Sequence, residues 1–159
     1  MNLKYNIRIF VALILFISIS CDGTLGGFDT VRFPISKKRL EVAFDSLYSK
    51  YPEYLIPQKW EENNNWSKRG YGFLDSRLLY FKNAPEEMYY ISFIGDQQTF
   101  KDTTHIDIAI RSVFIGSKNN WIEADNFNEQ DKSKIQARFK NEIISKLEEL
   151  TNSKSKDLD

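Results

Sequence analysis

The chain has 159 residues, a length typical of one domain. Its 22 basic and 22 acidic side chains give no basic excess, so we expect no nucleic-acid partner. The single cysteine, Cys21, excludes an internal disulfide framework.

Residues 1–20 have the pattern of a secretory signal peptide. Lys4 and Arg8 form a basic start, and residues 7–19 form a short, almost continuous apolar run. A permanent transmembrane helix, the alternative, needs about 20 apolar residues. We therefore predict a cleaved leader, whose removal leaves two more acidic than basic side chains.

The end of this leader resembles the lipobox of bacterial lipoproteins. Ser20 is the small residue expected before the cysteine, while Ser18 and Ile19 depart from the usual Leu-then-small pair, so the lipobox is a loose one. The resemblance implies that Cys21 becomes the mature N-terminus and carries a diacylglyceryl group and further acyl chains such as palmitate.

Two physical arguments favour lipidation of Cys21 over a free thiol left by different processing. An unpaired thiol is a liability in the oxidising environment outside the cytoplasm. Two or three acyl chains anchor a protein durably, because each buried CH₂ contributes about 0.8 kcal/mol. We expect the lipid on Cys21 to hold the protein on a membrane of the bacterial cell envelope, and the choice between inner and outer membrane stays open.

Glycine-rich and polar stretches divide the remaining chain. We predict a flexible tether over residues 21–35, with a short extended segment at 28–35. Residues 36–151 are predicted to form one domain, and residues 152–159 a polar tail that frays.

Two amphipathic helices are predicted at the ends of this domain. Ser36 and Asn128 are favoured helix N-cap residues, and Pro52 ends the first helix. The apolar stripes that follow the two caps have helical spacing and consist of Leu40, Phe44, Leu47 and Tyr51, and of Ile135, Phe139, Ile143 and Leu147.

Strands are predicted between the helices, at residues 73–82, 88–94, 104–115 and 121–124. Residues 88–94 are apolar on both faces, which favours a central position in the sheet. Short polar connections imply antiparallel neighbours. The predicted fold class is α+β: an antiparallel meander of three to four strands, covered on one face by the N-terminal and C-terminal helices.

Five residues form the candidate binding surface. Trp60 and Trp66 lie in an irregular polar stretch, where they either fasten it to the core or form a binding rim. His105, Asp107 and Arg111 alternate along one strand, which predicts a shared, partner-facing side.

The only histidine offers the one chemical hypothesis. His105 with Asp102 and Asp107 could hold a metal, or His105 could act as a base that Asp107 orients. The set lacks the second histidine or available cysteine of a typical zinc site. The sequence also has no GxSxG, P-loop, dinucleotide or HExxH motif. We predict no catalytic residue, no metal and no cofactor.

These observations favour a non-enzymatic, membrane-anchored lipoprotein that binds another protein or an envelope component. The alternatives are an immunity-type inhibitor of a secreted toxin, a small enzyme that uses His105, and a purely structural envelope protein.

Overall fold

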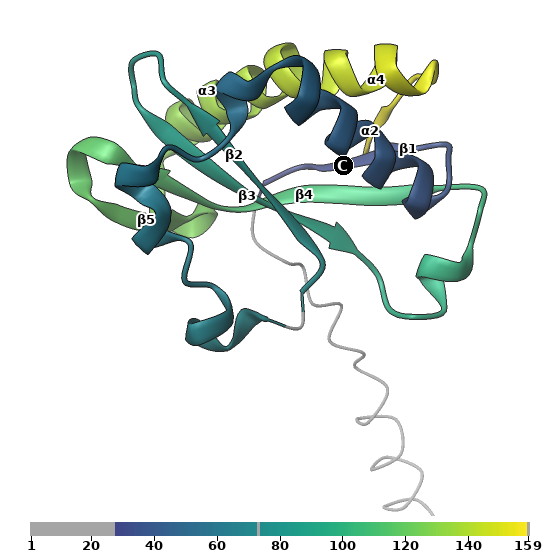
Figure 1. The fold of residues 1–159 in the computed structure, drawn as a ribbon, viewed down its shortest axis with the longest axis horizontal. Coiled ribbons are helices and arrows are strands. Elements are labelled where there is room, and N and C mark those ends of the chain that lie inside the picture. The colour runs from purple at the N-terminus through teal and green to yellow at the C-terminus, as the bar shows by residue number, and fades with distance from the viewer. Residues whose placement is uncertain (1–27, 73, 159) are drawn as a thin grey trace, which may run out of the picture.

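The computed structural model describes residues 28–72 and 74–158 (Figure 1). The leader and Cys21 lie outside the described residues. The fold is α+β, as predicted, and its strands join in one antiparallel sheet. The predicted strand number was too low, because the sheet has six strands.

The sheet is organised around its longest strand, β4. Neighbouring strands follow the order β2-β3-β4-β1-β6, and β5 also pairs with β4. β3 pairs with β4 along almost its whole length on one side. On the other side, β1 pairs with the first half of β4 and β5 with its second half. The strands are β1 (Thr30–Phe33), β2 (Ser76–Phe81), β3 (Glu87–Ile94), β4 (Ile106–Ile115), β5 (Asn120–Glu123) and β6 (Lys156–Leu158).

The folded unit extends beyond the predicted 36–151 at both ends. β1 lies within the predicted tether and pairs with β4 and β6. Within the predicted tail, the described residues 152–158 do not fray. Glu148 Oε1 accepts hydrogen bonds from the Ser155 backbone N–H and hydroxyl at 2.8 and 2.9 Å, and the chain then returns to the sheet as β6.

The predicted helix caps are confirmed. Ser36 Oγ accepts from the Arg39 N–H at the start of α2 (Lys37–Lys50), which ends before Pro52. Asn128 Oδ1 accepts from the Asp131 N–H at 2.8 Å at the start of α3 (Glu129–Phe139). α3 continues through a π-helical turn (Lys140–Ile144) into α4 (Ser145–Thr151).

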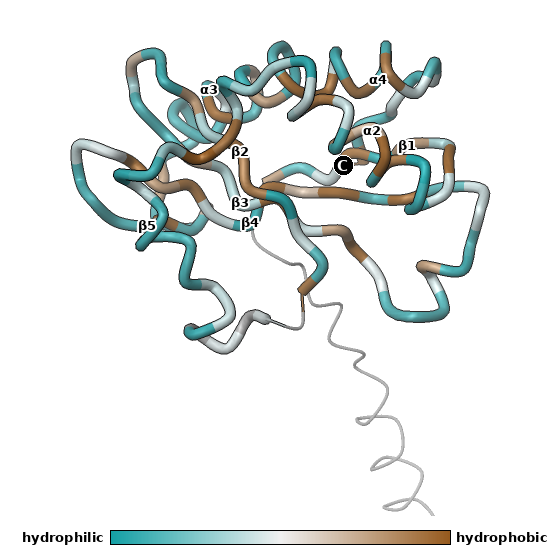
Figure 2. The backbone as a smooth tube through the Cα atoms, viewed as in Figure 1, coloured by the Kyte–Doolittle hydropathy of each residue, from teal (hydrophilic) through white to brown (hydrophobic). Residues whose placement is uncertain are grey.

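The helices lie on the same side of the sheet (Figure 1), and their apolar stripes form its main core. In the hydropathy colouring of Figure 2, apolar stretches recur along the strands and along the helices above them. The buried stripes include Leu40, Phe44 and Leu47 of α2 and Ile135, Phe139, Ile143 and Leu147 of the C-terminal helices. They pack against alternate residues of the strands, such as Leu79, Tyr89, Ile91 and Ile108.

The other side of the sheet, called the outer face here, carries a second apolar cluster. Tyr80, Met88 and Phe114 are its buried residues, and they alternate with the main-core residues along β2, β3 and β4. β3 lies between β2 and β4 and buries side chains on both faces, as its sequence predicted. Ile56 and Trp60 of the segment 52–72, with Trp121 of β5, pack on this outer cluster.

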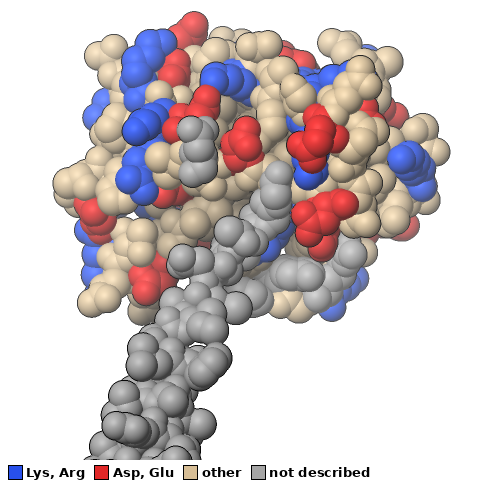
Figure 3. Space-filling view, turned by 180° about the vertical axis from the view of Figure 1, so that it is seen from behind, with Lys and Arg blue, Asp and Glu red and all other residues tan. Residues whose placement is uncertain are grey.

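The connections contain short helical turns. Within the segment 52–72 these are Pro52–Tyr54, Gln58–Asn63 and Ser67–Tyr71; elsewhere they are Thr99–Lys101, Gly116–Lys118 and Ala124–Asn126. Figure 3, which views the molecule from behind, shows acidic and basic side chains interspersed on that face. The visible surface therefore carries charges of both signs.

Candidate binding site

Trp66 lies on the outer face and is almost fully buried, with 5% of its surface exposed. Its ring stacks on Tyr90 of β3, with centroids 4.1 Å apart, and meets Trp121 edge to face at 4.9 Å. Aromatic pairs in such geometries contribute about 0.5–1.5 kcal/mol beyond the area they bury. Trp66 therefore fastens the segment 52–72 to the sheet and has little surface left for a partner.

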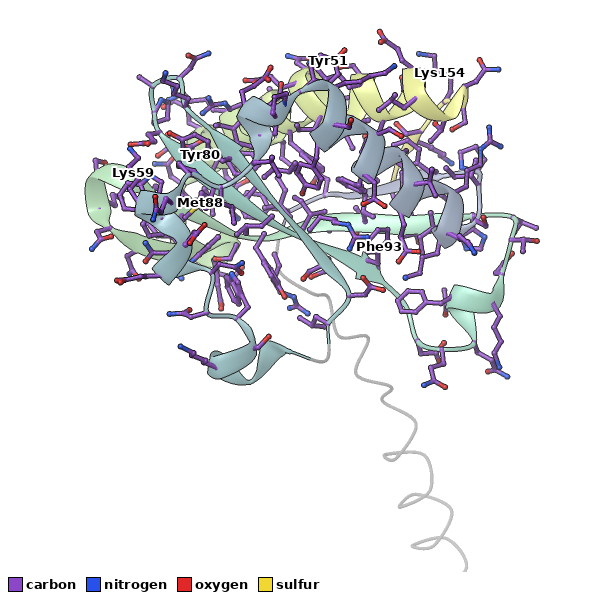
Figure 4. All side chains as sticks on the ribbon, in the orientation of Figure 1. Tyr51, Lys59, Tyr80, Met88, Phe93 and Lys154 are labelled. Carbon is purple, nitrogen blue, oxygen red and sulfur yellow. The ribbon has the colours of Figure 1, made fainter. Side chains whose placement is uncertain are left out.

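Trp60 holds the same segment at a second point. Its ring lies edge to face on Phe114 at 5.0 Å, and its Nε1 donates to Glu86 Oε1 at 3.0 Å. The same oxygen accepts from the Lys59 ammonium at 2.5 Å and the Tyr80 hydroxyl at 2.6 Å. Figure 4 labels Lys59 and Tyr80, two of the three side chains that donate to Glu86.

These hydrogen bonds shift two pKa values. The hydrogen bond from Lys59, reinforced by those from Tyr80 and Trp60, lowers the pKa of Glu86 to about 2. Burial and the hydrogen bond to Glu86 raise the pKa of Tyr80 to about 12. Glu86 therefore remains a carboxylate, and Tyr80 a neutral donor, throughout the physiological pH range.

The structure gives Asp107 a different partner from the His105 of the catalytic hypothesis. Its two oxygens accept from Arg32 Nε and Nη2 at 2.7 and 2.8 Å, across the paired strands β1 and β4. The hydrogen bond that Arg32 donates to Asp107 raises the pKa of Arg32. Because both carboxylate oxygens are engaged in this bidentate pair, Asp107 does not orient His105.

His105 instead lies beside residues of the preceding loop. Its Nδ1 is 3.3 Å from Asp102 Oδ2 and 3.1 Å from Thr104 Oγ1. Hydrogen bonds from Thr104 lower the pKa of Asp102. Within the part of the chain that the structure describes, no three His, Cys, Asp or Glu side chains are placed to hold a metal ion.

Arg111 lies at an irregularity in β4. Tyr90 pairs with Ser112, but its neighbour Ile91 pairs with Ile110, so β4 has one additional residue at a β-bulge. The main core accordingly takes Ile108 and Ile110 before the bulge and Val113 after it. The unbroken alternation that predicted one shared face for His105, Asp107 and Arg111 therefore stops at Arg111.

A pocket that the sequence did not reveal lies beside α3. It has a volume of about 370 Å³ and is bounded by α3, by the turn between β2 and β3 and by the connection between β4 and β5. Its apolar lining includes Pro85, Tyr89, Ile115, Phe127 and Ile135, and its charged lining consists of Glu87, Lys118, Asp131, Lys134 and Arg138.

The most buried part of this pocket, its floor, is a network of Glu87, Tyr89 and Arg138. Glu87 is 5% exposed, and its Oε2 accepts from the Tyr89 hydroxyl at 2.8 Å and from Arg138 Nη1 at 3.0 Å. Burial, followed by the charge of Glu87, raises the pKa of the Tyr89 hydroxyl. Glu87 is therefore a buried acid with two internal hydrogen-bond donors.

Arg138 connects α3 to the turn between β2 and β3. Besides Glu87, it donates to the carbonyls of Asn83 and Pro85 at 3.0 and 2.8 Å and to Glu142 Oε1 at 3.0 Å. One guanidinium thus serves two carboxylates. This contact could not be predicted, because residues 83–87 and 138–142 are far apart in the chain and come together only in the fold.

Two polar groups of the pocket have no internal partner. Among the side chains and backbone groups that the structure describes, none donates a hydrogen bond to Glu87 Oε1. The ammonium of Lys118, which is exposed, forms no ion pair or hydrogen bond with any of those groups either. The pocket therefore offers an acceptor at its floor and a cation at its rim.

No protein-family model, curated protein or solved structure matches this chain. Every helix in the described ranges is too short or too polar to cross a bilayer.

Proposed function

We propose that this protein is a lipid-anchored binding protein of the bacterial cell envelope and that it works without catalysis. The leader and the lipobox-like residues before Cys21 support the anchor. The pocket beside α3 supports the binding role, because ligand sites are commonly apolar clefts with a few placed polar groups and volumes of about 300–1,000 Å³.

The position of the pocket relative to the chain end is the observation that carries this proposal. Phe28, the first described residue, packs against Phe127, with ring centroids 6.1 Å apart. Phe127 lines the pocket. Cys21 precedes Phe28 by seven residues, which span at most about 25 Å when fully extended. A lipid on Cys21 would therefore keep the pocket close to a membrane surface.

The proposal includes the finer architecture predicted from the sequence. In it, β2 to β5 form a meander, and the N-terminal and C-terminal helices cover one of its faces. The successive antiparallel pairings of β2 with β3, β3 with β4 and β4 with β5 support this arrangement. In this arrangement α3 lies beside the turn between β2 and β3, and both line the pocket.

Detergent partitioning tests the anchor. The full chain is expressed in a bacterial host, and wild type is compared with Cys21→Ser and with Ser20→Ala, a control that keeps a small residue before the cysteine. We expect wild type and the control to enter the detergent-rich phase of a phase-separating detergent, and Cys21→Ser to leave it. Equal partitioning of wild type and Cys21→Ser would contradict the proposal.

A further inference from the structure

We infer that the pocket beside α3 binds a dipeptide-sized zwitterion with apolar side groups, whose ammonium meets Glu87 and whose carboxylate meets Lys118. This inference rests on the proposed binding role, but not on the lipid anchor. Its basis is that one apolar pocket is lined by a buried acid and an exposed lysine, each with a group that lacks a partner among the described residues.

The floor selects for a hydrogen-bond donor with positive charge. Glu87 Oε2 is engaged by Tyr89 and Arg138, which fixes the carboxylate and leaves Oε1 as an acceptor. Arg138 is shared with Glu142, so the charge of Glu87 is only partly compensated. Glu87 is 5% exposed, so Oε1 has little access to water, and an ammonium or amide donor from a ligand would satisfy it.

The rim selects for a negative group. Lys118 and Lys134 both line the pocket from exposed positions. Lys134 lies 3.3 Å from Asp131, which also lines the pocket, so these two charges offset one another. The ammonium of Lys118 is the lining cation that lacks such a partner in the described part of the chain.

The walls and the size of the pocket restrict what lies between the two charges. Ile115, Phe127 and Ile135 give these walls an aromatic and aliphatic lining. A simple inorganic anion would leave Glu87 Oε1 without a donor, and a fatty acid would place hydrocarbon against that carboxylate. A zwitterion with an apolar body satisfies both ends and fits a volume of about 370 Å³.

Isothermal titration of the full-length protein in detergent micelles tests the inference, with Leu-Phe as the probe. Two blocked forms of the same dipeptide isolate each charge: the N-acetyl form removes the ammonium, and the C-terminal amide removes the carboxylate. A charge-assisted hydrogen bond corresponds to about a tenfold to hundredfold change in affinity. We expect each blocked form to bind weaker than Leu-Phe by that factor.

Two variants assign the charges to their residues. Lys118→Met should bind Leu-Phe and its amide equally, while still discriminating against the N-acetyl form. Glu87→Gln should lose the discrimination against the N-acetyl form, with circular dichroism confirming that it is folded. Lys38→Met removes an exposed lysine of α2 that does not line the pocket and should bind as wild type does.

Absence of Leu-Phe binding at millimolar concentrations would overturn the inference. Equal binding of all three probes would also overturn it, as would a Lys118→Met variant that prefers the free acid as wild type does. These outcomes are distinguishable from failure of the anchor. A protein that partitions into detergent but does not bind Leu-Phe loses only the ligand assignment.

Discussion

Glu86 and Glu87 are adjacent in the chain, yet their carboxylates serve opposite faces of the sheet. Glu86 accepts three hydrogen bonds on the outer face, where Lys59 and Trp60 bring in the segment 52–72. Glu87 accepts from Tyr89 and Arg138 on the helix side. The hairpin of β2 and β3 therefore holds the irregular segment through one acid and α3 through the next.

We expect Glu86→Ala to lower the free energy of unfolding by about 1–2 kcal/mol, because three donors lose their common acceptor. The loss is not larger because Lys59 is largely exposed and its ion pair contributes little. Amide hydrogen exchange within residues 52–66 should become faster than exchange in α2. Glu62→Ala, at an exposed acid of the same segment, is the control and should leave both unchanged. Unchanged exchange in Glu86→Ala would show that this carboxylate does not fasten the segment.

The same carboxylate predicts a pH dependence. The pKa of Glu86 is lowered from 4.5 to about 2 in the folded protein. A depressed carboxyl pKa contributes stability that is present above the unfolded pKa and is lost as the pH falls through the folded pKa. Urea titrations between pH 5 and about pH 2 should therefore show a steeper loss of stability in wild type than in Glu86→Gln. Parallel curves would contradict this assignment.

Trp66→Ala should be among the most destabilising substitutions on the outer face. It removes a nearly buried ring that stacks on Tyr90 and contacts Trp121, and such truncations cost about 3–5 kcal/mol. Chemical denaturation measures the loss. Val42→Ala, at a position 56% exposed on α2, should change stability by less than about 0.5 kcal/mol. A loss below about 1 kcal/mol for Trp66→Ala would mean that the ring is not packed as described.

Ending the chain at Asn152 should lower stability by about 2 kcal/mol, because β6 and its hydrogen bonds to β1 are removed. The truncation also removes the donors of Ser155 to Glu148 and the ion pair of Asp157 with Lys140. The full-length variant Asp157→Asn, which loses only the ion pair, should lose much less stability than the truncated chain. A truncated protein as stable as the full chain would support the frayed tail that the sequence predicted.

The sequence was most informative where one local pattern determines a structure. Ser36, Pro52 and Asn128 mark helix ends through interactions within a few residues, and the apolar stripes identified the buried helix faces. β6 escaped prediction because Lys156 and Asp157 are exposed, so no apolar alternation marks it. It is held instead by pairing with β1, which lies more than a hundred residues earlier.

The candidate site was harder to predict for the same reason. His105, Asp107 and Arg111 followed a strand pattern, but that pattern could not show that Arg32 lies opposite Asp107 or that a bulge falls at Arg111. The pocket joins Glu87, Lys118 and Arg138 from three separate parts of the chain. No local sequence motif marks any of the three, and only the fold brings them together.

Mass spectrometry of the mature protein, extracted from bacterial membranes, tests the anchored binding protein most directly. The account predicts a chain that begins at Cys21, with a diacylglyceryl group on its sulfur and no residue of 1–20 remaining. A mature protein with an unmodified Cys21 thiol, or one that keeps its leader, would contradict it.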